Sequence, residues 1–190
     1  MNSFFKIRKF YQLKHVERSA KVGKRRESPA EHSWSCLMLA DYFLTKIPHS
    51  ALNRLKVYEL LMYHDVVEIE AGDVCISKEE ERKNKAQKEK EAAHILKEHL
   101  PVELKEKFLA LFEEFESGKS KEARFAKAID ALDAEIHELD YKEDWKGWTE
   151  DFLRRKKGPL FEEFPELKKA FEEIMIFAKK EGYFNQKQRN

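Results

Sequence analysis

Two histidines and two aspartates, drawn from three separate stretches of the sequence, have the side-chain types that a divalent-metal site needs. They are His32, His64, Asp65 and Asp130. Each lies beside an apolar, core-like face, where a charged side chain is costly unless it is paired or coordinates a metal. Imidazole and carboxylate ligands together suit ions such as Mn²⁺, Fe²⁺, Co²⁺, Ni²⁺ or Zn²⁺. An octahedral ion held by these side chains keeps positions open for water and substrate, so the set predicts a hydrolytic metal centre.

The alternative interpretation is a set of unrelated structural polar groups. A single histidine near a helix start more often caps the helix or lies at the surface, and a single mid-helix aspartate usually points to solvent. His64 and Asp65 are neighbours, which point about 100° apart on an α-helix. A short aspartate and a longer histidine at a helix end can still converge on one ion. Their combination with the other two residues favours the metal site.

Further carboxylates follow the histidine in LLMYHDVVEIEAGD, residues 60–73. Glu68 stands at i+4 from His64 and at i+3 from Asp65, so it shares their helix face if the helix continues that far. A carboxylate in that place can orient or deprotonate an attacking water, or protonate a leaving oxygen. Glu70 is expected to point to solvent.

Composition favours one helical domain in a reducing compartment. The 190 residues include only 6 Gly and 5 Pro, and 37 Lys and Arg balance 36 Asp and Glu, for a net charge of +1. That balance gives no case for a general nucleic-acid binder. No apolar run is long enough for a membrane span. The cysteines, Cys36 and Cys75, show no metal-ligand or disulfide spacing and are predicted to be free thiols in the cytoplasm.

Helical periodicity recurs along the chain, and no alternating strand pattern is present. The clearest local signal is SPAE, where Ser28 suits an N-cap, Pro29 the first helical position and Glu31 a capping box. Residues 16–27 are basic and predicted to form a loop. The predicted helices cover residues 3–17, 29–46, 51–65, 94–100, 101–117, 121–144 and 165–180, with another after Gly147. The charged segment at residues 77–93 is predicted to be either a solvated helix start or a mobile loop. The whole chain is therefore predicted to be all-α.

The periodicity also predicts which side chains point inward. Leu55 and Met62 belong to the expected buried stripe of residues 51–65, and Ile136 to that of residues 121–144. Trp145 and Trp148, with Phe152, are expected to pack in the core or to form a dimer contact. Residues 154–157, Arg-Arg-Lys-Lys, are expected to form a solvated linker.

The order and context of the candidate ligands resemble a known family. His32, then His64-Asp65, then Asp130 is similar to the H…HD…D signature of the HD-domain metal-dependent phosphohydrolases. The segments RRESPAEHSW, MYHDVVEIEAGDV, KEEERKNKAQKEKEA and AKAIDALDA resemble the corresponding segments of its 5′-deoxynucleotidase-like branch. The resemblance runs from about Arg18 to Asp140. The two-residue HD motif alone is weak, but these segments in order are specific.

The resemblance implies a role for each matched residue. His32, His64, Asp65 and Asp130 match the metal ligands, with the ion one of Mn²⁺, Co²⁺, Fe²⁺, Ni²⁺, Zn²⁺ or Mg²⁺. Glu68 and Asp73 match acidic residues of the catalytic site, and Arg18 matches a phosphate-contacting arginine, a role that a guanidinium suits. Asp133 is a rival ligand because it follows Asp130 on a similar face. The chain departs from the branch at Ser19-Ala20, where bacterial members carry a tryptophan next to the substrate's sugar.

The family also implies a fold and an activity. We expect a soluble, cytoplasmic, all-α protein with one HD-domain helical bundle over residues 1–190, in which C-terminal helices pack on a core of about residues 18–140. The expected activity is hydrolysis of (deoxy)nucleoside 5′-monophosphates, small-molecule substrates, by a homodimer that binds neither nucleic acid nor membrane. One alternative is a hydrolase of nucleoside triphosphates, cyclic nucleotides or alarmones on the same site. Another is a non-catalytic helical binding protein.

Overall fold

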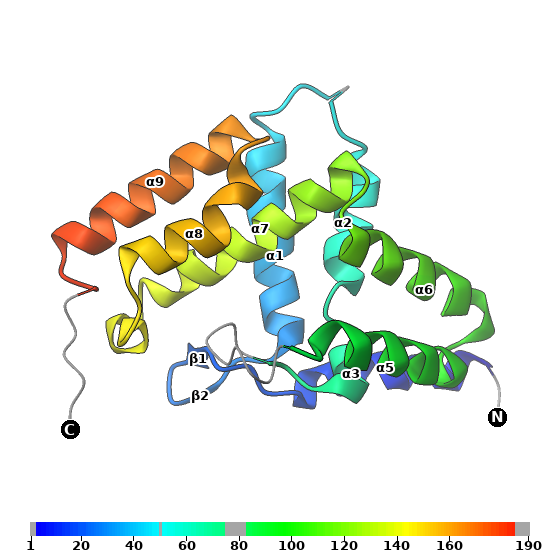
Figure 1. Ribbon diagram of the computed structural model, residues 1–190. Helices are drawn as coiled ribbons and strands as arrows, with labels where there is room; N and C mark the ends of the chain where they lie inside the picture. The colour runs from blue at the N-terminus through cyan, green and yellow to red at the C-terminus, as the bar shows by residue number, and fades with distance from the viewer. Residues whose placement is uncertain (1–2, 50, 75–82, 185–190) are drawn as a thin grey trace.

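The fold is an assembly of helices with one short hairpin, seen in a computed structural model that describes residues 3–49, 51–74 and 83–184 (Figure 1). The prediction of an all-α protein is confirmed. In chain order the elements are η1 (Ser3–His15), β1 (Lys21–Val22), β2 (Arg25–Arg26), α1 (Pro29–Leu44), α2 (Arg54–Tyr63), α3 (Glu68–Ala71), α5 (Lys85–His99), α6 (Val102–Ser117), α7 (Lys121–Glu138), η2 (Lys142–Trp145), α8 (Glu150–Phe161) and α9 (Pro165–Lys180).

The start of α1 is fixed by the predicted capping box. The Ser28 backbone N–H donates to Glu31 Oε2 at 2.9 Å, and the Glu31 N–H donates back to Ser28 Oγ at 3.4 Å. Pro29 occupies the first turn, where its missing N–H costs nothing. His32 therefore lies in the first turn of a well-defined helix, and its side chain is buried.

A helix end places His64 and Asp65. Helix α2 begins at the Asn53 N-cap and ends at Tyr63, with His64 as its C-cap. The preceding Leu60 and Leu61 are fully buried, so the apolar run anchors this helix end in the core. The short helix α3 then begins at Glu68 and ends before Gly72, whose φ of +73° is a conformation that glycine adopts without a steric penalty.

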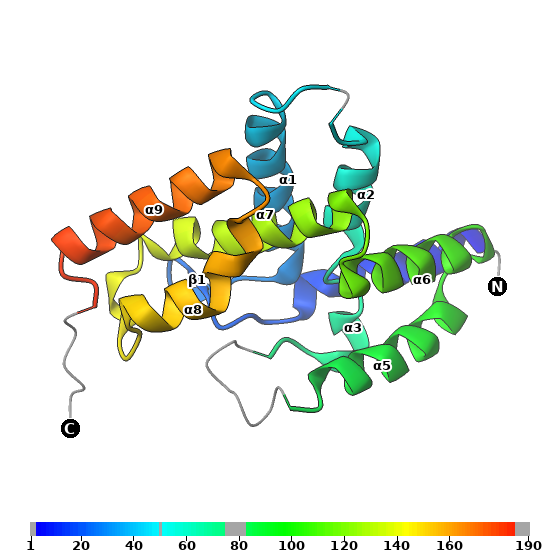
Figure 2. The ribbon, with the colours of Figure 1, turned by 45° about the horizontal axis from the view of Figure 1, so that its top comes forward.

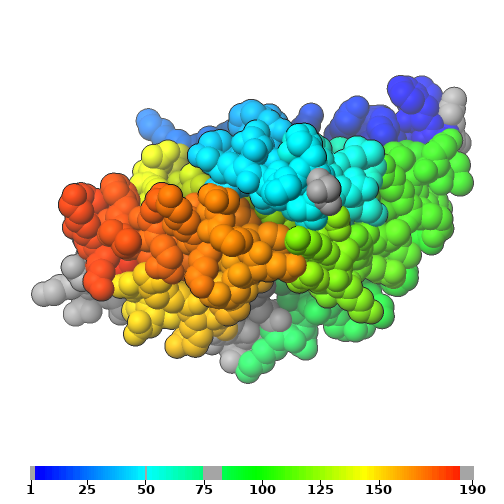
Figure 3. Space-filling view, turned by 90° about the horizontal axis from the view of Figure 1, so that it is seen from above, coloured from blue at the N-terminus to red at the C-terminus, as the bar shows by residue number. Residues whose placement is uncertain are grey.

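Helix α7 lies at the centre of the molecule. It packs against α1, α2 and α6 on one side and against α8 and α9 on the other (Figures 1 and 2). Seen from above, the connection from α1 into α2 (cyan) lies between the C-terminal helices (orange to red) and the green helices of the middle of the chain (Figure 3). Buried side chains from α1 through α9 belong to one apolar core.

Several local predictions were wrong. The predicted loop at residues 16–27 contains an antiparallel hairpin that pairs Lys21 with Arg26 and turns at Gly23, whose φ is +62°. Strands of two residues are too short to show an alternating pattern. The first predicted helix is a 3₁₀ helix, and residues 154–157 lie inside α8 rather than in a linker. Cys75 and residues 78–82 of the charged segment lie outside the described residues.

The inward stripes were also partly wrong. Leu55 is 67% exposed, Met62 47% and Ile136 38%. Within the described ranges, no helix has both the length and the apolar character that a bilayer span requires.

Candidate active site

One nitrogen of His64 is buried without a hydrogen bond. The other nitrogen, Nδ1, lies 2.8 Å from the carbonyl oxygen of Leu61. A carbonyl only accepts, so Nδ1 carries the proton and Nε2 presents a lone pair. Nε2 has no hydrogen-bond partner among the residues that the structure describes. A buried lone pair of this kind is a ready metal ligand, oriented by the bond on the far side of the ring.

His32 is oriented by two aspartates of α7. Its Nδ1 lies 2.9 Å from Asp133 Oδ2, and its Nε2 lies 2.9 Å from Asp130 Oδ1. Burial lowers the pKa of His32, but the Cys36 sulfur and the two carboxylates raise it, and the net pKa is well above the usual value. Asp133 therefore holds the far side of the His32 ring, while Asp130 lies on the side of the candidate ligands.

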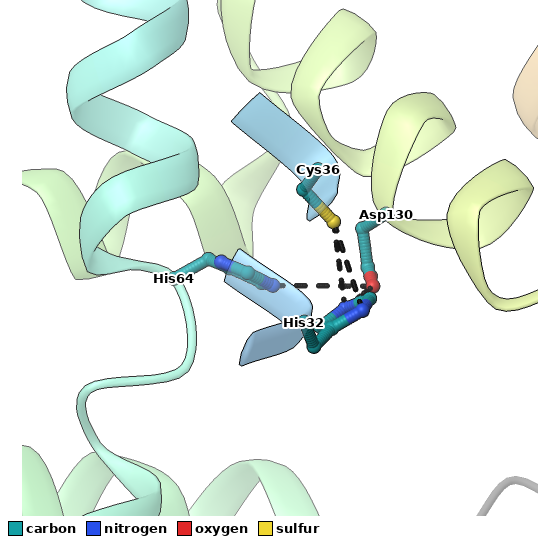
Figure 4. Close-up of side chains that lie close together, drawn as sticks. All are labelled: His32, Cys36, His64 and Asp130. Atoms are coloured by element: carbon teal, nitrogen blue, oxygen red, sulfur yellow. Dashed lines mark hydrogen bonds and ion pairs between the residues drawn. The ribbon is translucent and has the colours of Figure 1, made fainter. Parts of the chain in front are cut away.

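The two imidazoles and Asp130 converge on one point, although they come from three helices (Figure 4). One ligand atom from each of His32, Cys36, His64 and Asp130 lies within 4.8 Å of the others. His64 Nε2 is 3.9 Å from Asp130 Oδ1, and the two imidazole ring centres are 5.4 Å apart.

Asp65 borders this group rather than belonging to it. Its Oδ1 is 3.2 Å from His64 Nε2, and its Oδ2 is 4.0 Å from His32 Nε2. The same Oδ2 accepts a hydrogen bond of 3.1 Å from Arg18 Nη1. The adjacent residues His64 and Asp65 thus both face the candidate ion site at the end of α2.

Cys36 enters the group because it lies one turn after His32 on α1. Its Sγ is 3.5 Å from His32 Nε2. Burial, which outweighs the neighbouring imidazole, raises the pKa of the Cys36 thiol to about 12. A metal ligand must be the thiolate, and a bound cation can itself deprotonate a thiol that coordinates it. The structure therefore brings His32, His64 and Asp130 of the predicted ligand set together, with Asp65 at the border of the group and Cys36 as an additional buried neighbour.

Arg18 is carried to the site by the hairpin. The backbone N–H of Arg18 donates to the Glu27 carbonyl at 2.8 Å, and the Glu27 N–H donates to the Ala20 carbonyl at 3.0 Å. The Arg18 guanidinium also donates to Glu27 Oε2 through Nε at 3.1 Å, besides its bond to Asp65. The buried carboxylate of Glu27 on one side and the partly buried carboxylate of Asp65 on the other fix the cation next to the candidate ligands.

Glu68 and Asp73 line the same cavity of about 460 Å³ as the candidate ligands and Arg18. Glu68 is buried and its Oε2 has no hydrogen-bond partner within the described part of the chain. Burial, with Asp65 and Asp73 nearby, raises the pKa of Glu68 to about 10. Glu70 is outside the cavity and pairs with Lys9 at 2.6 Å. The structure therefore brings together all the predicted site residues around one cavity.

The sequence pattern of the HD domain matches residues 10–168. The chain belongs to the HD-domain family. Its curated relatives include proteins named 5′-deoxynucleotidase HDDC2. The one from Bos taurus is 30% identical over 77% of this chain and 72% of its own length, and the one from Homo sapiens is 28% identical over 77% and 72%.

Solved structures show the same HD-domain arrangement. A predicted metal-dependent phosphohydrolase from Magnetospirillum magnetotacticum is 28% identical, with a TM-score of 0.82 and 95% of each chain covered. An HD-domain phosphohydrolase from Listeria innocua shares the fold, with a TM-score of 0.66, 16% identity, and 96% of this chain and 92% of that one covered.

Sequence reasoning missed several residues around the HD-domain site. Cys36 has a signal, since i+4 from His32 is the same helix face. The sequence predicts Asp133 as a rival ligand, but its contact with Nδ1 of His32 depends on how α1 crosses α7. Glu27 is buried beside Arg18, and the pairing of the hairpin that puts it there has no sequence pattern. His137 approaches Glu27, with 3.6 Å between its Nδ1 and Glu27 Oε1.

Replacing Asp65 or Cys36 separates the two possible ligand sets. We expect Asp65→Ala to lose bound metal and phosphatase activity, because it removes a carboxylate that faces the candidate ion site. We expect Cys36→Ala to keep both, because both imidazoles and both carboxylates of the predicted ligand set remain. Metal content by mass spectrometry, on proteins with matching thermal melts, measures the difference. Loss of metal from Cys36→Ala with retention in Asp65→Ala would reverse the assignment.

Proposed function

We propose that this HD-domain protein is a divalent-metal-dependent 5′-nucleotidase, which converts (deoxy)nucleoside 5′-monophosphates to nucleoside and phosphate. The observation that carries the proposal is the buried Nε2 of His64, which makes no hydrogen bond within the described residues and converges with His32 and Asp130 beside Arg18. Relatives named 5′-deoxynucleotidase cover most of the chain and support the substrate class.

The proposed metal ligands are His32, His64, Asp65 and Asp130. A divalent ion held there supplies charge stabilisation and an activated water for attack on phosphorus. The chain orients its own ligands before any substrate arrives: Leu61 fixes the His64 ring and Asp133 fixes the His32 ring. Such pre-orientation costs no reorganisation when the reaction occurs. The proposed ion is one of Mn²⁺, Co²⁺, Fe²⁺, Ni²⁺, Zn²⁺ and Mg²⁺.

Arg18 is proposed to bind the substrate phosphate. A guanidinium can donate several hydrogen bonds in a fixed fork and is always charged. Burial opposes the charge, but Asp65 and the other site carboxylates raise the pKa of Arg18 above its usual value. The carboxylates of the site therefore keep the Arg18 side chain in the charged form that binds phosphate.

Glu68 and Asp73 are proposed to handle protons. Both line the cavity, and Glu68 sits one turn beyond the His64-Asp65 pair. A buried carboxyl group such as that of Glu68, whose Oε2 makes no hydrogen bond within the described residues, can donate a proton to a leaving oxygen or accept one from an attacking water.

A phosphate-release panel tests the function. With added Mn²⁺ or Co²⁺ we expect turnover of nucleoside 5′-monophosphates, no release of pyrophosphate from triphosphates, and loss of activity in EDTA that returns with metal. Ribose and deoxyribose forms of each base belong in the panel because Ser19-Ala20 lines the cavity. Activity confined to triphosphates, cyclic nucleotides or alarmones would select the alternative hydrolase, and no turnover with any metal would select a binding protein.

Replacement of Glu68 tests the proposed proton transfer. We expect Glu68→Gln to lower kcat by roughly 10²- to 10⁴-fold, the range that general acid–base groups contribute, with metal content unchanged. Asp73→Asn is expected to lower kcat as well. Glu70→Gln is the matched control, because that carboxylate lies outside the cavity, and its kcat should equal that of the wild type. Full activity in Glu68→Gln would remove Glu68 from the mechanism.

An exposed apolar face supports the proposal of a homodimer. Trp34, Met38 and Tyr42 recur at every fourth position of α1 and are exposed, and Leu55 and Met62 are exposed on the adjacent helix α2. Met38, Leu55 and Met62 line one shallow apolar hollow between the two helices. Contiguous exposed apolar surface of this kind marks interaction sites. The cytoplasmic location stays a prediction from the sequence.

A charge placed on this face is expected to separate the dimer. Met38→Glu should shift the mass in light scattering from dimer to monomer, because an ionised group would be buried in the interface. Ile176→Glu, on the exposed face of α9, is the control and should leave the dimer intact. A wild-type monomer across micromolar concentrations would contradict the proposal.

A further inference from the structure

The cavity continues well beyond the candidate metal ligands. Along α7 its lining residues run from Asp130 through Ala131 and Ala134 to Glu138. This stretch of helix measures about 12 Å at about 1.5 Å per residue. The volume of about 460 Å³ is in the usual range for small-molecule sites. A substrate with its phosphate at Arg18 and Asp130 therefore has room for its remaining parts along α7.

The cavity is also lined by Trp148, which precedes α8, and by Leu160 of α8, and we call these two residues the far wall. On α7 the cavity lining includes the small side chains of Ala131 and Ala134 beside the carboxylates of Glu135 and Glu138. Ser19 and Ala20 of the hairpin segment line the same cavity. Small side chains leave space for a flat group, and Trp148 is the large aromatic side chain that the far wall offers to it.

Trp148 is held in place by its local structure. Its backbone N–H donates to the Trp145 carbonyl at 3.0 Å, and its ring meets Phe152 edge to face, with centres 5.3 Å apart. Gly147 before it has a φ of +86°, which allows the turn. Thr149 after it caps α8 by accepting a hydrogen bond of 3.1 Å from the Phe152 N–H. The indole is therefore positioned before any ligand binds.

A buried ion pair fixes the helix that follows Trp148 onto α7. Lys157 of α8 donates to the Ala131 carbonyl at 3.2 Å and pairs with Glu135, and both side chains are almost fully buried. Buried charges persist only when paired, so this pair sets the register of α8 against α7. The far wall consequently stands at a fixed distance from Asp130.

We propose that Trp148 stacks on the nucleobase of the substrate and so makes the site selective for nucleotides over sugar phosphates. The inference rests on the proposed 5′-nucleotidase function. Every base has a π-face, so stacking contributes affinity without reading base identity. The far wall therefore predicts acceptance of all bases, with the larger purine rings bound more tightly than pyrimidines.

Steady-state kinetics on two kinds of substrate test the inference. For deoxynucleoside 5′-monophosphates we expect Trp148→Ala to raise KM by about 10-fold, within the roughly 5- to 150-fold range for loss of base stacking, with kcat unchanged. For 2-deoxyribose 5-phosphate, which has no base, neither constant should change. Phe177→Ala, an exposed aromatic of α9 outside the cavity, is the control and should match the wild type with both substrates.

A binding signal complements the kinetics and does not depend on turnover. Addition of dAMP to the metal-free protein should quench tryptophan fluorescence in the wild type and in Trp34→Phe. Trp148→Phe, which keeps an aromatic ring if Trp148→Ala does not fold, should lose the quenching.

The outcomes distinguish the two proposals. If the wild type releases phosphate from neither substrate, the proposed function fails. If it hydrolyses both, but Trp148→Ala changes neither KM or changes both equally, the stacking inference is overturned. Quenching that persists in Trp148→Phe also overturns it.

Discussion

The site depends on one constraint. Each of its two buried imidazoles must be hydrogen-bonded at one ring nitrogen so that the other nitrogen faces the candidate ion position. His64 uses a carbonyl of its own helix, and His32 uses Asp133 on α7. The carbonyl of Leu61 fixes the tautomer of His64, and each of the two bonds fixes the direction of the remaining ring nitrogen. The elements that supply these bonds are placed by strong local signals, namely the capping box before α1 and the buried leucines that anchor the end of α2. The proposed ligands His32 and His64 are therefore positioned by helix termini that pack against α7.

The site residues that the sequence could predict are those whose side-chain type and local sequence context already indicate metal binding. The imidazoles and the carboxylates of the four proposed ligands stand beside apolar faces, and their order matches a family signature, so the sequence identifies them. The helix starting at Pro29 and that spanning Pro165–Lys180 were predicted because caps and proline mark their ends. The ligand geometry was not predictable in detail, since the distances from His32 to Asp130 and Asp133 depend on the crossing of α1 and α7.

The incorrect predictions share a physical cause, which is that amphipathic patterns do not say what covers a helix. Leu55 and Met62 have the spacing of a buried stripe, yet α2 is covered on its other faces by α1, α6 and α7. Residues 154–157 look like a solvated basic run because the sequence does not show Glu135 as the partner of Lys157. A buried lysine needs a carboxylate partner in the folded protein. Lys157 has Glu135 as its partner because α8 folds back along α7.

The ion pair between Glu135 and Lys157 joins α7 to α8, and both residues line the cavity. Removing one member of a buried pair costs roughly 3–5 kcal/mol, because the other charge is left without compensation. Asp130 and Asp133 face His32 from α7, and Glu135, about half a turn further, holds α8. Helix α7 thus carries the proposed ligand Asp130 on one face. On another face it carries Glu135, which fixes the position of α8 and so of the far wall. A change in the packing of α8 would move the wall relative to the phosphate end while leaving the ligand hydrogen bonds intact. Substrate preference can therefore change in this fold without rebuilding the metal site.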